Sequence, residues 1–171
     1  MIGRPQDRNL EREELRRLAL EYAGRPELWR HLVRHDPDAR IYEELHRDDH
    51  LGIWLICWMK DHDTGFHDHD ISSGALAVAD GKIREERLGI GGIASDVLVG
   101  PGGSVEFGAA DIHRVTHGGG GPAVTIHAYS PPLWRMGAYE IQPTGQLLRH
   151  SVSYAEELRP VESGSPPAIA A

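Results

Sequence analysis

Two histidines separated by a single residue, His67 and His69, are the first feature of this sequence that points to chemistry. Residues two apart on a β-strand project from the same face, so both imidazoles can reach one metal ion. Histidine is the commonest metal ligand, although surface histidines also produce this spacing by chance. A third histidine, His113, follows a Gly-Pro-Gly-Gly turn and a short strand pattern. Together the three residues favour a metal site built from strands.

Three further residues lie close to these histidines in the strand pattern. His117 comes four residues after His113 and shares its face of a strand. We expect it at the rim of the site or behind a ligand rather than as a ligand itself. His127 and Tyr129 share the face of a later strand. They are either an ordinary hydrogen-bonded core pair or a proton-handling pair beside the metal, and the pattern alone leaves both readings open.

The composition is that of an ordinary globular protein and excludes several classes of function. The 171 residues suit one domain, and the single cysteine, Cys57, excludes a disulfide framework or a multi-cysteine zinc site. We expect Cys57 to be a small buried hydrophobe. The net charge of −8 argues against binding to nucleic acid or an anionic membrane. No long apolar run and no apolar N-terminal stretch is present, so we expect a cytoplasmic protein, and nothing in the sequence requires more than a monomer.

The pattern of short apolar runs separated by glycine, proline and aspartate predicts a mainly β fold, a sandwich or barrel with N-terminal α-helices. Residues 1–40 read as a helical segment, with Gly24 ending one helix and Pro26 starting another. Residues 41–158 read as the barrel, and residues 159–171 as a disordered tail. Asp80-Gly81 predicts a β-hairpin. Arg40 to Arg47 form either a last helical turn or a first strand.

Four short strings resemble thiol dioxygenases of the cysteine dioxygenase type, within the cupin superfamily. They are Cys-Trp at 57–58, His-Asp-His-Asp at 67–70, Ile-His-Arg-Val at 112–115 and Thr-Ile-His-Ala-Tyr-Ser-Pro-Pro-Leu at 125–133. The resemblance implies a small cupin barrel, a double-stranded β-helix or jelly roll, that holds one Fe(II) per chain. Family members use O2 to oxidise a thiol to a sulfinic acid, so cysteine or a related small thiol is the implied substrate.

The resemblance also implies roles for individual residues. His67, His69 and His113 match the iron ligands, and His127 and Tyr129 match the catalytic pair. Thr125 matches a position that usually carries a hydroxyl group, and we expect it among the substrate-binding residues.

The residues support a thiolate substrate by a separate argument. Many cupins have a glutamate a few residues after the paired histidines, but Ser72, Ser73 and Gly74 supply no acid here, and Asp70 is out of phase. Three neutral imidazoles leave the charge of a divalent ion unbalanced, which favours an anionic ligand such as a thiolate. Zinc fits three histidines as well as iron does, so the choice of iron follows from the resemblance.

The sequence departs from the family pattern at two positions. Some members cross-link the tyrosine to a cysteine, but the matching position is Gly74. The arginine that binds the substrate carboxylate falls on Glu44 if Tyr42 is aligned. Glu44 would repel a carboxylate, which favours a cationic thiol or one without that contact, and Arg40 and Arg47 are the nearby candidates for substrate binding.

Two other functions remain open at this point. One is a different metallo-cupin enzyme, a non-thiol dioxygenase or an isomerase that uses zinc or manganese. The other is a non-catalytic cupin that binds a small molecule. The His127–Tyr129 pair favours the thiol dioxygenase, because a binding module has no need of both groups beside its ligands.

Overall fold

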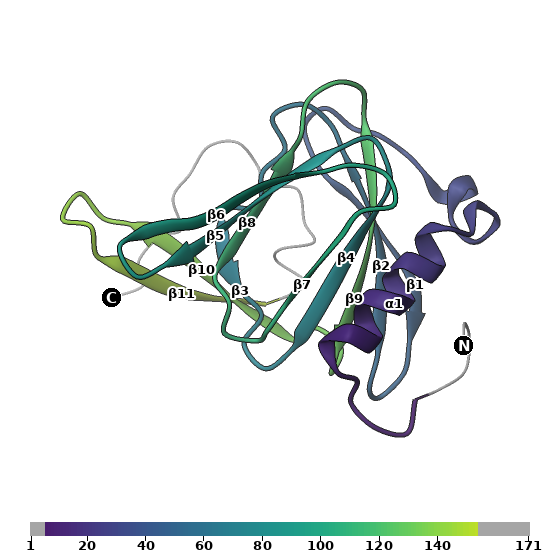
Figure 1. Ribbon diagram of the computed structural model, residues 1–171, viewed down its shortest axis with the longest axis horizontal. Coiled ribbons are helices and arrows are strands. Elements are labelled where there is room, and N and C mark those ends of the chain that lie inside the picture. The colour runs from purple at the N-terminus through teal and green to yellow at the C-terminus, as the bar shows by residue number, and fades with distance from the viewer. Residues whose placement is uncertain (1–5, 154–171) are drawn as a thin grey trace.

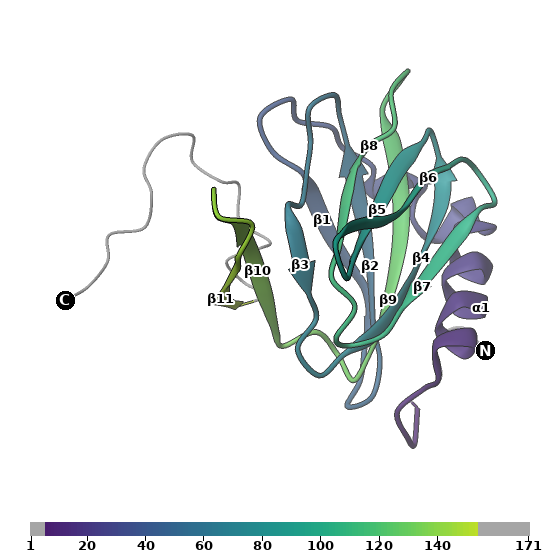
Figure 2. The same cartoon turned by 60° about the vertical axis from the view of Figure 1, so that its left-hand side comes forward.

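A computed structural model describes residues 6–153, in which two antiparallel sheets face each other and one α-helix covers the outside of the first sheet (Figures 1 and 2). The first sheet has the order β1-β2-β9-β4-β7, and the second β11-β10-β3-β8-β5-β6. The strands are β1 Ile41–Arg47, β2 Gly52–Trp58, β3 Phe66–Asp68, β4 Ser73–Asp80, β5 Ile83–Gly89, β6 Gly92–Val99, β7 Ser104–Phe107, β8 His113–His117, β9 Ala123–Ser130, β10 Arg135–Ile141 and β11 Leu147–Ser153. The mainly β prediction is confirmed.

Helix α1, Arg12–Ala23, packs on the outer face of the first sheet through one apolar stripe. The buried residues of the stripe are Leu15, Leu18, Ala19 and Tyr22. The expectation of more than one N-terminal α-helix was wrong, because only the 3₁₀ turns Pro26–Leu28 and Arg30–Leu32 follow α1 in the described chain. Gly24 caps α1, and Pro26 begins a 3₁₀ turn instead of a second α-helix.

Strand β9 is buried along its whole length because both of its faces are covered. Val124, Ile126 and Ala128 belong to the cluster under α1, while His127 and Tyr129 alternate with them and face the space between the sheets. Strand β2 has the same arrangement, which explains why its sequence has no polar face. Cys57 lies in the cluster under α1, buried as expected.

Two local elements differ from or refine the sequence-based expectations. Residues 41–47 form a strand, not a helical turn. Asp80-Gly81 does not close a hairpin, because β4 pairs with β7 and β9 whereas β5 pairs with β6 and β8. The turn instead carries the chain from one sheet to the other. Gly81 has φ +68°, and a Cβ there would lie 2.4 Å from the Pro122 carbonyl oxygen, so the corner requires glycine.

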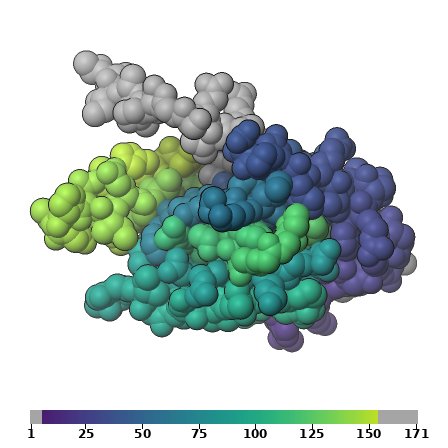
Figure 3. All heavy atoms as spheres, turned by 90° about the horizontal axis from the view of Figure 1, so that it is seen from above, coloured from purple at the N-terminus to yellow at the C-terminus, as the bar shows by residue number. Residues whose placement is uncertain are grey.

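The β10–β11 hairpin projects at the edge of the second sheet, on the side away from α1 (Figure 3). No helix within residues 6–153 has both the length and the apolar character needed to cross a bilayer. The segment expected to be a disordered tail lies outside the described residues, and the domain boundaries expected at residues 40 and 158 stay predictions.

Candidate metal centre

Three buried histidines meet between the sheets. His67 on β3 is directly paired with His113, the first residue of β8, and His69 follows the end of β3. One ring nitrogen from each lies within 4.8 Å of the other two. The pairing of β3 with β8 therefore brings His67 and His113, which are distant in the sequence, into one cluster, and this cluster has the size of a metal-ligand set.

The hydrogen bonding of the cluster fits a metal ion. Both ring nitrogens of His69 and the Nε2 of His113 are buried and have no hydrogen-bond partner among the described residues. A buried polar atom without a partner costs about 1–3 kcal/mol, which a bound cation would offset. Burial, and then the neighbouring His67, hold the pKa values of both residues well below the usual range. The imidazoles are thus kept neutral, in the form that coordinates metals.

Asp68, between the two paired histidines, faces the other way and anchors the strand. It accepts hydrogen bonds from Arg149 Nε at 2.7 Å, Tyr139 Oη at 2.6 Å and the Gly137 amide at 3.1 Å. Burial raises its pKa, but the hydrogen bonds from Arg149 and Tyr139 outweigh this and hold the pKa well below its usual range. The His-Asp-His string therefore supplies two candidate ligands and, between them, the ion pair that fixes β3 to β10 and β11.

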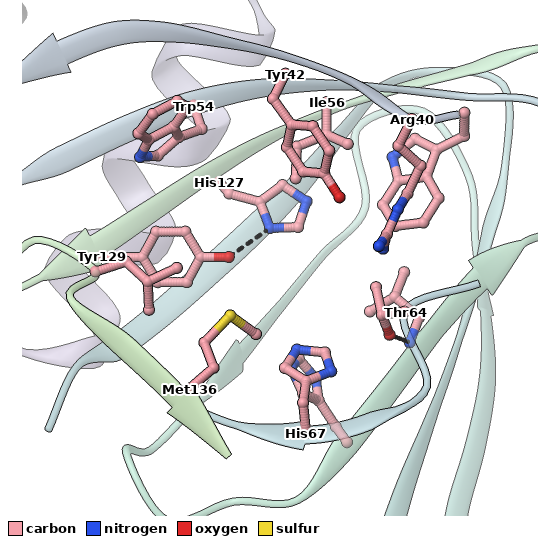
Figure 4. Close-up of a pocket in the computed structure, with 13 residues that line it drawn as sticks. Arg40, Tyr42, Trp54, Ile56, Thr64, His67, His127, Tyr129 and Met136 are labelled. Atoms are coloured by element: carbon pink, nitrogen blue, oxygen red, sulfur yellow. Dashed lines mark hydrogen bonds between the residues drawn. The ribbon is translucent and has the colours of Figure 1, made fainter. Parts of the chain in front are cut away.

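A cavity opens beside the cluster, and aromatic and apolar side chains form most of its wall (Figure 4). Arg40 and Tyr129 extend into it from different sides, and His67 lies across from them. The lining residues are Arg40, Tyr42, Trp54, Ile56, Trp58, Thr64, His67, His113, Val115, His127, Tyr129, Leu133 and Met136. Arg40 is the one permanently charged side chain among these described residues, so the cavity is suited to a small ligand with one anionic group.

Three buried side chains connect Tyr129 to the core. Trp58 Nε1 donates to Thr125 Oγ1 at 2.8 Å, which lies 2.9 Å from His127 Nε2. Thr125 is fully buried and these are its two side-chain hydrogen bonds in the described structure, so its hydroxyl proton goes to Nε2. The neutral His127 then carries its proton on Nδ1 and donates it to the Tyr129 oxygen at 3.1 Å. This polarity directs the Tyr129 proton away from His127, toward an acceptor in the cavity.

Folding stability should depend on pH through His127. Burial, followed by the charges of His67 and Arg40, lowers the pKa of His127 to about 3, whereas the unfolded residue titrates near about 6.5. Between these two pH values His127 binds a proton in the unfolded chain but not in the folded one. The contribution of His127 to the free energy of unfolding is therefore fully present above pH ~6.5, and it falls by about 1.4 kcal/mol for each pH unit below that. We expect the free energy of unfolding, measured by urea titration of the metal-free proteins, to fall less between pH 7 and pH 5 in His127→Gln than in the wild type. Equal losses in the two proteins would contradict this assignment.

The two candidate arginines lie in different places. The guanidinium of Arg40 lies 5.5 Å from the ring centroids of both Tyr42 and Trp58, inside the cavity. Arg47 pairs with Glu44 at 3.3 Å, and neither residue lines the cavity. The two arginines are at opposite ends of β1, because Arg40 directly precedes the strand and Arg47 is its last residue. Glu44 therefore gives no reason to exclude a thiol that carries a carboxylate.

The position that carries a cross-linking cysteine in some relatives is filled differently. Gly74 is paired with Tyr129 across β4 and β9, and a Cβ on Gly74 would lie 2.3 Å from the ring of Phe107. Phe107 also stacks on His69, with ring centroids 4.4 Å apart. The aromatic ring thus occupies the space beside Tyr129 and supports a candidate ligand, a role that the sequence alone did not suggest.

The remaining histidines of interest lie elsewhere. His117 is 2.9 Å from the Gly121 carbonyl oxygen, and His150 is exposed near Glu140. Neither belongs to the histidine cluster or lines the cavity. Thr125, expected near the substrate, lies behind His127 rather than on the wall of the cavity.

Comparisons with solved structures show a cupin fold at low sequence identity. A cupin superfamily protein from Desulfitobacterium hafniense has a TM-score of 0.53 at 12% identity, over 75% of this chain and 98% of that one. A Thermus thermophilus protein has a TM-score of 0.53 at 17% identity, over 60% and 92% of the two chains. A Bacillus halodurans protein has a TM-score of 0.51 at 21% identity, over 67% and 79%. These likenesses confirm the predicted cupin barrel and carry no information on activity.

The sequence itself gives the family. No curated protein matches the chain at a significant level. The model of the family described as cysteine dioxygenase type I, in contrast, matches residues 5–142. This range includes all three clustered histidines and the His127–Tyr129 pair. The chain therefore belongs to the cysteine dioxygenase type I family.

Proposed function

We propose that this protein is an Fe(II)-dependent thiol dioxygenase that converts a small thiol and O2 into the corresponding sulfinic acid. One observation carries the proposal: among the described residues, three buried histidines without an acidic ligand lie at one side of a narrow cavity whose one permanent charge is Arg40. A ligand with a thiolate at one end and a carboxylate a few bonds away satisfies both. Family membership supports the same chemistry.

The residues of the chain have separate roles in this proposal. Iron(II), when bound by His67, His69 and His113, supplies the redox chemistry that joins O2 to a thiolate sulfur. Arg40 holds the carboxylate through charge-assisted hydrogen bonds, and its stacking on Tyr42 and Trp58 fixes the direction of the guanidinium. The Tyr129 hydroxyl donates to an oxygen atom during its transfer to sulfur, and the apolar wall excludes water.

The proposal is tested by O2 consumption with Fe(II)-loaded protein and a panel of thiols. The panel contains cysteine, 3-mercaptopropionate, cysteamine and ergothioneine, and mass spectrometry checks for the gain of two oxygen atoms. We expect one of the small carboxylate thiols, cysteine or 3-mercaptopropionate, to drive coupled O2 uptake, and cysteamine to react poorly because it has no group for Arg40. Bound iron without turnover of any thiol would instead support another metallo-cupin activity.

Replacing Arg40 with methionine should weaken substrate binding specifically. The change keeps much of the length of the side chain but removes a charged hydrogen-bond donor worth about 1.5–3 kcal/mol. We expect kcat/KM for the preferred carboxylate thiol to fall about 10–100-fold, mainly through KM, with the metal content unchanged. Arg47→Met is the matched comparison, because Arg47 is outside the cavity. Equal losses in both variants would contradict the assignment of Arg40.

A further inference from the structure

Glu85 is a fully buried acidic side chain next to the candidate metal centre. It lies on β5, with a relative exposure of 1%. Its Oε1 accepts a hydrogen bond from Arg87 Nε at 2.7 Å and lies 3.1 Å from His113 Nδ1. Strand pairing explains the contact, because β5 runs beside β8 and Arg87 is the register partner of His113.

This contact decides which nitrogen of His113 faces the cluster. Oε1 of Glu85 already accepts from Arg87 Nε, so the same oxygen meets His113 Nδ1 as an acceptor. His113 must then carry its proton on Nδ1 and donate it to Glu85. Its Nε2 is left unprotonated, and that atom is buried without a hydrogen-bond partner among the described residues, in a ring that belongs to the histidine cluster. The ring is therefore prepared to coordinate through Nε2.

Glu85 also places a carboxyl group in contact with one of the three candidate ligands. His67 Nδ1, in comparison, lies 3.0 Å from the neutral Gly65 carbonyl oxygen. The other buried acid nearby, Asp68, is turned away from the cluster and neutralised by Arg149. A carboxylate hydrogen-bonded to a ligand histidine raises the basicity of that ligand and fixes its orientation.

We propose that Glu85, held by Arg87, is a positioning residue for the metal: it sets the tautomer and direction of His113 and raises the basicity of that ligand. The inference rests on the metal site of the proposed function but not on its thiol chemistry. It predicts that metal affinity depends on Glu85 whichever substrate the protein uses.

The test measures the affinity of the metal-free protein for Co(II) and Zn(II), by competition with a chromophoric chelator. Glu85→Gln should bind about 10–100-fold more weakly than the wild type. Glu86→Gln is the matched control, since Glu86 is the next residue on β5 and pairs with Arg114 at 3.5 Å. It should bind like the wild type. Equal affinities of Glu85→Gln and wild type would overturn the inference, whereas a wild type that binds neither ion would overturn the metal site itself.

A second measurement needs no variant. In the Zn(II)-loaded wild type, ¹⁵N NMR of the histidine rings should show His113 with a proton on Nδ1 and the metal on Nε2. A protonated Nε2 or coordination through Nδ1 would overturn the inference even if Glu85→Gln failed to fold.

Discussion

Replacing His113 with alanine is expected to remove both the bound metal and all thiol-dependent O2 uptake. The change leaves two candidate ligands, His67 and His69, where three buried imidazoles meet in the intact protein. Loss of a group that only supports a ligand costs about 10–100-fold in metal affinity, so loss of the ligand itself should cost more than ~100-fold. The metal content after dialysis and the O2 uptake rate with the preferred thiol measure the two effects.

The control for this prediction is His117→Ala, on the same strand. His117 shares residue type and strand with His113 but lies outside the cluster, near the Gly121 carbonyl oxygen. Its replacement should preserve metal content and turnover. A His113→Ala protein that keeps stoichiometric metal and turns over thiol would remove His113 from the ligand set. Melting temperatures of both metal-free variants separate loss of the ligand from loss of the fold.

The clustered histidines were predictable because local geometry and strand spacing carry most of the information. Alternation along a strand predicts that His67 and His69 converge, and the structure brings their rings to 4.9 Å. Alternation also explains why His127 and Tyr129 face the same space. The fold class followed from the short, regularly spaced apolar runs, since a buried two-sheet barrel imposes that spacing.

Pairing between distant strands could not be predicted, and it decides the rest of the site. Residues 82–88 are mostly charged, so the sequence does not distinguish Glu85 from its charged neighbours. Glu85 is buried because β5 pairs with β8. Likewise, aligning Tyr42 suggested Glu44 as the group facing the substrate, whereas Arg40 lines the cavity and Glu44 does not. Asp80-Gly81 correctly marked a tight turn, but the choice between a hairpin and a sheet-crossing corner depends on which strands pair afterwards.

Replacing Tyr129 with phenylalanine is expected to leave the metal bound and to slow turnover. The hydroxyl group accepts from His127 Nδ1 at 3.1 Å, and the chain of donors that begins at Trp58 directs its own proton into the cavity. Removing a fixed donor to a reacting oxygen costs about 100–1000-fold in kcat in well-studied enzymes. We expect a loss of about 100-fold in kcat, with KM for the thiol little changed because the proposed contact between Arg40 and the carboxylate is kept.

The readouts of this variant separate a catalytic hydroxyl from a packing one. If Tyr129 donates during oxygen transfer, its loss also lets O2 be consumed without sulfinate formation, so the ratio of O2 consumed to product should rise above that of the wild type. Tyr42→Phe removes a hydroxyl from the same cavity wall but leaves the His127–Tyr129 contact in place, and it should keep the ratio unchanged. A Tyr129→Phe protein with wild-type rate and coupling would make Tyr129 a packing residue. In that case the hydrogen bonds from Thr125 through His127 to Tyr129 would stabilise the core, and the direction of the Tyr129 proton would have no role in the reaction.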